Sequence, residues 1–362
     1  MSQSTASAPQ PLAGEALGRA YKAVSTLYHA YLTGLILTVV TRRDRADAAE
    51  LMFRTFRHQH LEKFLPGLKL LGLDKLPHAV ACAQYHYLSN HLGGVKVEFM
   101  PESDRKAWVR YVPPRWIFHG TAICGIPSEL SRAMLRGWHA HNGVSLGNPR
   151  LGFVCTKQTV DGQDSLEGYY CEYDHDLAPE ERLRFAPGEA GPPFDPAQAP
   201  RMAGDDWPAE RFRKVERNYA MEYVRSVLPV MAGLFGEADT RFLGSVTGKL
   251  IGMQFHDEVA ALLDVQGDTG EDFARLMQRF GEAVGDAVTW ARDGADLWIE
   301  QPPPRIFRGL APLPSAAVDG WHSLWEGLLA VHNRALRLDL IDRCDRGDAV
   351  YRWRLRGGSV SV

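Results

Sequence analysis

The stretch Pro113-Pro114-Arg115-Trp116-Ile117-Phe118-His119-Gly120 recurs later in the chain as Pro302-Pro303-Pro304-Arg305-Ile306-Phe307-Arg308-Gly309. Each copy is followed by an apolar residue, a proline and a serine, and then by a stretch of helical pattern that carries a tryptophan. An asparagine and a strand of alternating pattern come next, at Asn148 and at Asn333. The offset drifts only from 189 at the first motif to 185 at the asparagines. The same features in the same order indicate an internal duplication.

The duplication predicts an α+β fold made of two tandem repeats. In each repeat a helical layer packs on a small antiparallel sheet, and the two repeats form an intramolecular pseudo-dimer. The linker between them is rich in proline and glycine, so we expect no regular element there. The expected segments are a disordered tail (1–16), the first repeat (17–178), the linker (179–208), a second, diverged repeat (209–356) and a short tail (357–362).

Hydrophobic periodicity predicts the elements of each repeat. In the first repeat we expect three or four helices up to about Gly94, a hairpin, a helix that begins at Pro127-Ser128, and a closing hairpin. In the second repeat we expect helices from about Glu210 to Ala291, strands around 296–300 and Ile306, a helix from Ser315 and a final hairpin.

Composition limits the classes of function. The chain is 45% hydrophobic and 23% charged, as in soluble globular proteins. Its net charge of -3, with both signs interspersed, gives no electrostatic footprint for nucleic acid. The most apolar run, Ala30 to Val40, is well short of the roughly 20 residues that span a bilayer, so we expect a buried helix and no membrane partner. Five scattered cysteines without a CxxC pair suggest free thiols in a reducing cytoplasm.

The order of helices, hairpin, helix and closing hairpin resembles the 4-vinyl reductase-like ligand-binding domains, which are related in fold to a vesicle-tethering subunit and to sensor domains of aromatic-catabolism regulators. Within that group the motifs of residues 148–173 look most like the L-2-amino-thiazoline-4-carboxylic acid hydrolase family. That family carries a Gly-acidic turn before a Cys-Asp-Phe closing strand. Here the turn is longer, Glu replaces Asp and Tyr replaces Phe. The motifs are Asn148-Pro149-Arg150-Leu151, Thr156-Lys157-Gln158-Thr159, Gly162-Gln163-Asp164 and Cys171-Glu172-Tyr173.

This resemblance implies a small-molecule hydrolase that acts without a cofactor on a C–N bond of a small heterocyclic or amide-like substrate. Cys171 would be the nucleophile, His141 the base that activates it, and Glu172 the acidic residue of the same motif. The second repeat has Arg352-Trp353 where we expect the Cys-acidic pair, so only the first repeat would keep the site. Alternatively, Cys171 packs as a small apolar residue. The protein is then a non-catalytic small-molecule sensor or scaffold, or, like the tethering relatives of the fold, serves protein interaction only.

Aromatic and basic residues could complete a substrate pocket between the sheet and the helix after Pro127. An arginine can clamp a carboxylate, while aromatic rings supply an apolar wall. Packing in an ordinary core is the alternative for the rings. The candidate substrate-binding residues are Arg110, Arg115, Trp116, Trp138 and Tyr169, with Trp108 and Tyr170 beside them.

Other motifs indicate no cofactor or metal. Only Cys155 and Cys171 bracket the closing hairpin, which is too few for zinc. His60-x-Glu62 and His256-x-Glu258 are interpreted as surface charge, because residues i and i+2 of a helix face different directions. Gly244-x-x-x-Gly248-Lys249 is one residue short of a P-loop and lies in a helical stretch. The expected partner is a small molecule, and homodimer formation stays open.

Overall fold

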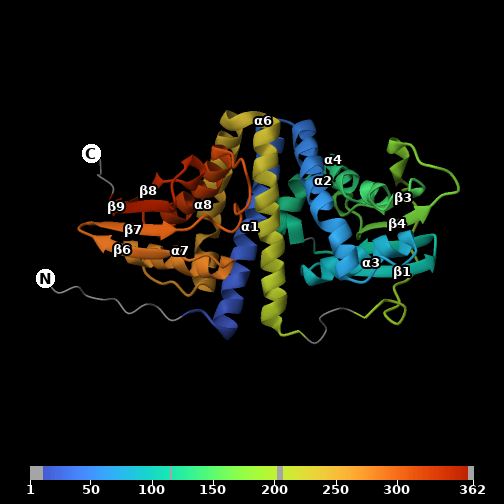
Figure 1. Ribbon diagram of the computed structural model, residues 1–362, viewed down its shortest axis with the longest axis horizontal. Helices are drawn as coiled ribbons and strands as arrows, with labels where there is room; N and C mark the ends of the chain where they lie inside the picture. The colour runs from blue at the N-terminus through green and yellow to red at the C-terminus, as the bar shows by residue number, and fades with distance from the viewer. Residues whose placement is uncertain (1–10, 115, 202–206, 358–362) are drawn as a thin grey trace.

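The chain has a mixed α+β fold with two small sheets, each covered by helices (Figure 1). The computed structural model describes residues 11–114, 116–201 and 207–357. The predicted α+β class is therefore confirmed. The two sheets lie at opposite ends of the molecule, with long helices between them (Figure 1).

The first half contains three long helices before its first strand. These are α1 (Gly14–Arg42), α2 (Arg45–Leu70) and α3 (His78–Leu92). The rest of the half comprises β1 (Val97–Ser103), β2 (Lys106–Tyr111), the short helices η1 (Trp116–Phe118) and η2 (Gly120–Gly125), α4 (Ser128–Gly137), η3 (His139–His141), α5 (Asn142–Ser145), β3 (Leu151–Lys157), η4 (Thr159–Asp161) and β4 (Leu166–Glu172).

The second half begins after η5 (Pro179–Arg182) and β5 (Leu183–Phe185) with a very long helix, α6 (Ala209–Leu262). Gly236 of α6 has a φ of 78° and breaks the helical geometry at that residue. The element α6 therefore consists of two consecutive helices, and the first half likewise begins with two, α1 and α2. The remaining elements are α7 (Gly270–Val284), β6 (Thr289–Asp293), β7 (Asp296–Gln301), α8 (Ser315–His332), β8 (Leu336–Asp342), η6 (Cys344–Arg346) and β9 (Tyr351–Gly357).

The two sheets share their strand order and register. The first has the order β1-β2-β4-β3-β5 and the second β6-β7-β9-β8. Tyr111 pairs with Leu166 in the first sheet, as Gln301 pairs with Tyr351 in the second. Each closing hairpin has an irregularity at the same place, between Cys155 and Lys157 and between Leu340 and Asp342. A short 3-10 turn ended by a left-handed glycine follows in both, at Gly162 (φ 80) and Gly347 (φ 102).

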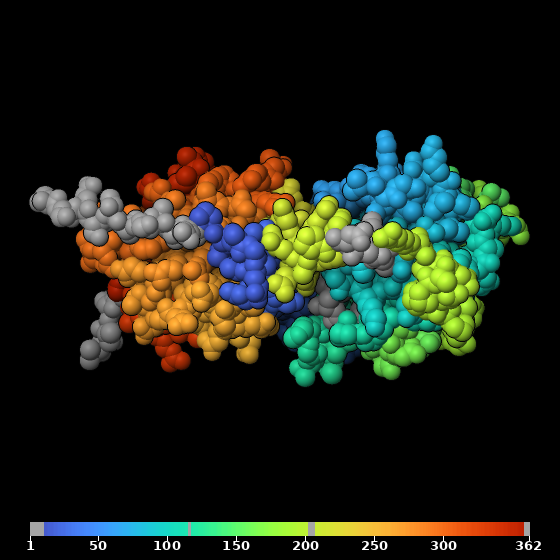
Figure 2. All heavy atoms as spheres, turned by 90° about the horizontal axis from the view of Figure 1, so that it is seen from below, coloured from blue at the N-terminus to red at the C-terminus, as the bar shows by residue number. Residues whose placement is uncertain are grey.

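The halves are joined by a shared core around α1 and α6, which run side by side at the centre (Figures 1 and 2). Tyr28 of α1 packs edge-on against Phe280 and accepts a hydrogen bond from Trp321 of the second half. In the other direction, Tyr219 of α6 donates to the Ser89 carbonyl of the first half. The largest buried cluster thus contains side chains from both halves, so the two are not insulated domains.

Glycines allow α6 and α8 to pack closely. A Cβ built at Gly252 would lie 2.3 Å from the carbonyl oxygen of Leu324, and one at Gly248 would lie 2.7 Å from that of Gly320. Only a residue without a side chain fits so near another backbone. The Gly244-Gly248-Lys249 motif is therefore part of a helix contact.

Three expected boundaries are wrong. The linker contains a strand, because β5 pairs in parallel with β3. Residues 14–16, expected in a tail, begin α1. The end of the predicted helical region forms β6, while Ile306 lies outside any strand. The two missed strands, β5 and β6, are short and are stabilised by pairing with β3 and β7, which a local pattern does not reveal.

Helix α1 was predicted as a buried helix, and its core-facing residues are buried. By length and composition it is also, among the described residues, the one helix that could cross a membrane. Of its most apolar window, 61% is buried inside the protein, as in the core helix of a soluble protein, which passes the same test.

Candidate functional site

The structure places Cys171 and His141 on opposite faces of the first sheet. Residues 166, 168, 170 and 172 of β4 point toward the helices, because side chains of a strand alternate. Cys171 therefore points outward, where it packs against Tyr169 and Trp108. His141 lies on the helical side, where its Nδ1 is 2.8 Å from the Arg136 carbonyl oxygen and its ring is 6.2 Å from that of Phe53. The predicted nucleophile and base are not brought together.

The surroundings of Cys171 do not favour a thiolate. Burial raises the pKa of its thiol, although Lys106 and Arg105 oppose this shift. Cys155 points to the inner face, where burial raises its pKa to about 12. Because the two cysteines lie on opposite faces, they do not form a common site.

The outer face of the first sheet is covered by residues 186–194, which we call the strap. The carboxylate of Glu167 is fully buried there and accepts hydrogen bonds from Arg110, Thr156 and the Gly191 amide. Arg110 also pairs with Glu98 and donates to the Pro192 carbonyl. The predicted substrate-binding residues Arg110 and Tyr169 thus lie beneath the strap, and Arg110 is engaged by carboxylates of the chain itself.

The inner face of the same sheet holds a buried polar network. His60 Nε2 is 2.9 Å from Asn142 Oδ1, and Asn142 Nδ2 donates to the Tyr170 hydroxyl at 2.8 Å. His60 is only 1% exposed, so its interpretation as surface charge is wrong. Burial lowers the pKa of His60 to about 3, and burial lowers that of His86 to about 3. The buried set also includes the predicted pocket residue Trp138, whose ring packs edge-on against His60 at 5.5 Å.

Two other predicted residues are not tested at a site. Arg115 lies outside the described residues, and of Trp116 only the backbone, which begins η1, is described. The expected counterpart of the Cys-acidic pair is also corrected by strand register. Arg352 and Trp353 pair with Glu300 and Ile299, as Glu167 and Gly168 pair with Arg110 and Val109 in the first sheet, so they match Glu167 and Gly168. The residues that match Cys171 and Glu172 are Arg356 and Gly357.

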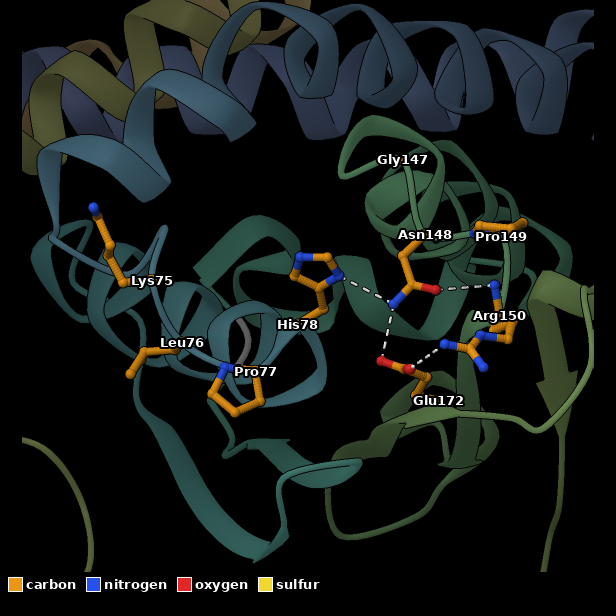
Figure 3. Close-up of a pocket in the computed structure, with 9 residues that line it drawn as sticks. All are labelled: Lys75, Leu76, Pro77, His78, Gly147, Asn148, Pro149, Arg150 and Glu172. Atoms are coloured by element: carbon orange, nitrogen blue, oxygen red, sulfur yellow. Dashed lines mark hydrogen bonds and ion pairs between the residues drawn. The ribbon is translucent and has the colours of Figure 1, made fainter.

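Glu172, by contrast, lines a pocket at the edge of the first sheet (Figure 3). The pocket has a volume of about 560 Å³ and is open to solvent. It brings together the end of β4, the segment before β3 and the loop that leads into α3. Its lining residues are Lys75, Leu76, Pro77, His78, Gly147, Asn148, Pro149, Arg150 and Glu172.

Asn148 organises the polar side of the pocket. Its Oδ1 accepts a hydrogen bond from the Arg150 backbone amide at 3.1 Å. Its Nδ2 is 3.0 Å from His78 Nδ1 and donates to Glu172 Oε2 at 2.9 Å. Arg150 reaches the other carboxylate oxygen, Oε1, at 3.2 Å. Two of the family-like motifs, at 148–151 and 171–173, therefore meet in one pocket (Figure 3).

The matching place in the second half carries small residues. Leu151 pairs with Glu172 in the first sheet, and Leu336 pairs with Gly357 in the second. The residue before each of these leucines is Arg150 or Ala335, and the first residue of α3 or α7 is His78 or Gly270. Asn333 makes the same turn as Asn148, because its Oδ1 accepts a hydrogen bond from the Ala335 backbone amide. Its Nδ2, however, donates to the Asp268 carbonyl and not to a side chain.

A second pocket, of about 450 Å³, lies in the second half between α8 and β8. It borders the place that matches the first pocket, because Arg334, the counterpart of Pro149, lines it, but its lining includes neither Gly270, Ala335 nor Gly357. We therefore take the pocket at Glu172 as the candidate functional site.

Sequence reasoning found Glu172 but missed His78 and Lys75. Period-two alternation would have separated Cys171 from Glu172, because neighbouring strand residues face opposite ways. No local signal marks His78, which lies 70 residues from Asn148 in the chain.

No family model, curated protein or solved structure matches this chain.

Proposed function

We propose that this chain is a small-molecule-binding protein, built from two diverged copies of one α+β unit, with its ligand site in the pocket at Glu172. The proposal of a tandem pseudo-dimer is supported by the common strand order, the common register and the common irregularity of the closing hairpins. Identical pairing over two sheets is hard to reach independently. The 4-vinyl reductase-like resemblance of the sequence agrees with a binding role for such units.

One observation carries the location of the site. Three polar residues of the first pocket, His78, Arg150 and Glu172, stand where the second half has Gly270, Ala335 and Gly357. A framework needs none of these side chains, because the second half folds the same turn around Asn333 without them. Convergent polar groups in a concave place are the usual mark of a ligand site.

This difference between the two halves can be tested by replacing the three polar residues of the first pocket with the residues at the matching positions of the second half. In the triple variant His78→Gly, Arg150→Ala, Glu172→Gly, we expect ligands found by NMR screening of a fragment library to lose binding. Circular dichroism would check that the variant remains folded. Arg346→Ala, which removes an exposed arginine from the second half, serves as control and should bind normally. Unchanged binding by the triple variant would refute the location.

Hydrolysis of a C–N bond in this pocket is a second candidate function. It is favoured by Glu172, whose carboxylate is 20% exposed at the pocket wall and could act as a general base. In this proposal Cys171 takes no part, because it faces away from the pocket. Glu172→Gln should then abolish turnover of a bound amide-like compound and leave its binding nearly intact, while Cys171→Ser should retain turnover. Activity that depends on Cys171 would contradict this mechanism.

A further inference from the structure

The polar groups of the Glu172 pocket differ in what they can offer a ligand. The orientation of the Asn148 amide is fixed, because its Oδ1 accepts from the Arg150 backbone N–H. Its Nδ2 therefore faces both His78 Nδ1 and Glu172 Oε2. An amide nitrogen is only a donor, so His78 Nδ1 is the acceptor in that contact. The neutral His78 ring then carries its hydrogen on Nε2 and offers a donor.

Glu172 already uses part of its acceptor capacity within the chain. One of its oxygens is held by Asn148 and the other by Arg150. The guanidinium of Arg150 has five N–H groups, of which this ion pair uses one, and its side chain is 47% exposed. Lys75 adds an exposed ammonium on the other side of His78 (Figure 3). Two cations, Lys75 and Arg150, and one carboxylate, which is paired with Arg150, thus line the pocket, so its charged side chains carry a net positive charge.

The helix beside the pocket, α3, adds to the positive charge of the lining. Helix α3 begins at His78, with no side chain capping its N-terminus and no acidic residue in its first turn. The positive end of its dipole is therefore not offset locally, and it lies at the pocket wall. By itself this end would define no site, but here it coincides with Lys75, His78 and Arg150.

From this donor-rich lining we infer that the ligand carries a compact oxyanion, a carboxylate or a phosphate, paired with the cations of this pocket, Arg150 and Lys75. The inference rests on the proposed function, since it names the chemistry of the ligand in the same pocket. A planar guanidinium suits a two-oxygen group, and His78 Nε2 is a further donor in the same pocket. A cationic ligand would meet two like charges.

The test compares ligands that share a ring and differ in charge. Benzoate, phenyl phosphate, benzamide and benzamidine would be titrated by NMR and calorimetry, with inorganic phosphate and acetate as the bare anions. We expect the anions to shift the resonances of His78 and Arg150, and benzamidine to leave them unchanged. The relative affinities of benzoate and phenyl phosphate distinguish the carboxylate from the phosphate source.

Variants sharpen the comparison. Lys75→Ala should weaken anion binding about ten-fold, the usual worth of one charge-assisted contact. Lys69→Ala removes another exposed lysine, which lies outside the pocket, and should have no effect. If the pocket binds only neutral or cationic fragments, the oxyanion inference is overturned and the proposed function stands. If no fragment of any charge binds there, the proposed function itself falls.

Discussion

The two halves share a framework but differ in where they place polar residues. In the first half, Arg110 and Glu167 form an ion pair whose carboxylate is fully buried. At the matching positions of the second half the charges are reversed, as Glu300 and Arg352, and both side chains are about 40% exposed. The difference follows from the strap, which covers the outer face of the first sheet and belongs to a segment that comes before α6.

The inner faces differ in the same sense. Tyr170 of the first sheet belongs to a buried hydrogen-bond network, while its counterpart by register, Leu355, lies in an apolar core. Strand order and register are thus compatible with very different chemistry at the same positions. The comparison teaches that pairing specifies the framework, whereas the first half carries extra polar groups that the framework does not require.

The ion pairs offer the largest expected contrast. Arg110→Met would leave Glu167 buried with only the neutral donors Thr156 and Gly191, so we expect a loss of about 3 kcal/mol in the free energy of unfolding. Arg352→Met removes an exposed partner and should cost less than about 1 kcal/mol. Urea unfolding of both variants measures the difference. Equal losses would show that the strap does not isolate the first pair from solvent.

The buried network should give a somewhat smaller effect. Asn142→Leu leaves His60 Nε2 and the Tyr170 hydroxyl without their shared partner, and we expect a loss of about 2 kcal/mol. Adding Tyr170→Phe removes one of the orphaned groups, so the double variant should lose less than the sum of the single variants. Strict additivity in urea unfolding would mean that the two residues are not coupled.

The smallest effect concerns pH. Burial lowers the folded-state pKa of His86 to about 3, below its ordinary value of 6.5, so the unfolded chain binds the proton more tightly. Stability from this group is complete above pH 6.5 and is lost as pH falls toward 3, by about 1 kcal/mol at pH 5.5. His86→Phe should reduce the slope of that part of the stability profile, to which His60, with its similarly lowered pKa, still contributes. Replacement of the exposed His119 by Gln is the control, and an unchanged slope in His86→Phe would exclude His86 as the cause.

Much of the framework was predictable from sequence. The hairpin at 97–111, the helix after Pro127 and the closing hairpin from Leu151 follow from alternation and from turn residues. The α+β class expected from the repeated proline-aromatic stretch is confirmed, while the duplication itself stays a prediction. Strand β6 was missed because its residues, Thr289 to Asp293, are mostly exposed and carry no apolar alternation.

The site was less predictable, for reasons that particular residues make clear. Cys171 and Glu172 are neighbours in sequence, but alternation along β4 sends one to the strap side and the other to the pocket. Lys75 lies in the loop before α3 and His78 is the first residue of that helix, so only the tertiary fold brings them into one pocket with Arg150. The burial of Arg110 depends on the strap, whose proline-rich composition suggested a free linker.

The most direct test of the central claim, that the first half alone keeps the ligand site, is crystallographic fragment screening of the whole chain. The account predicts bound fragments beside His78, Arg150 and Glu172, and none at Gly270, Ala335 and Gly357. Fragments at both places, or only in the second half, would contradict it.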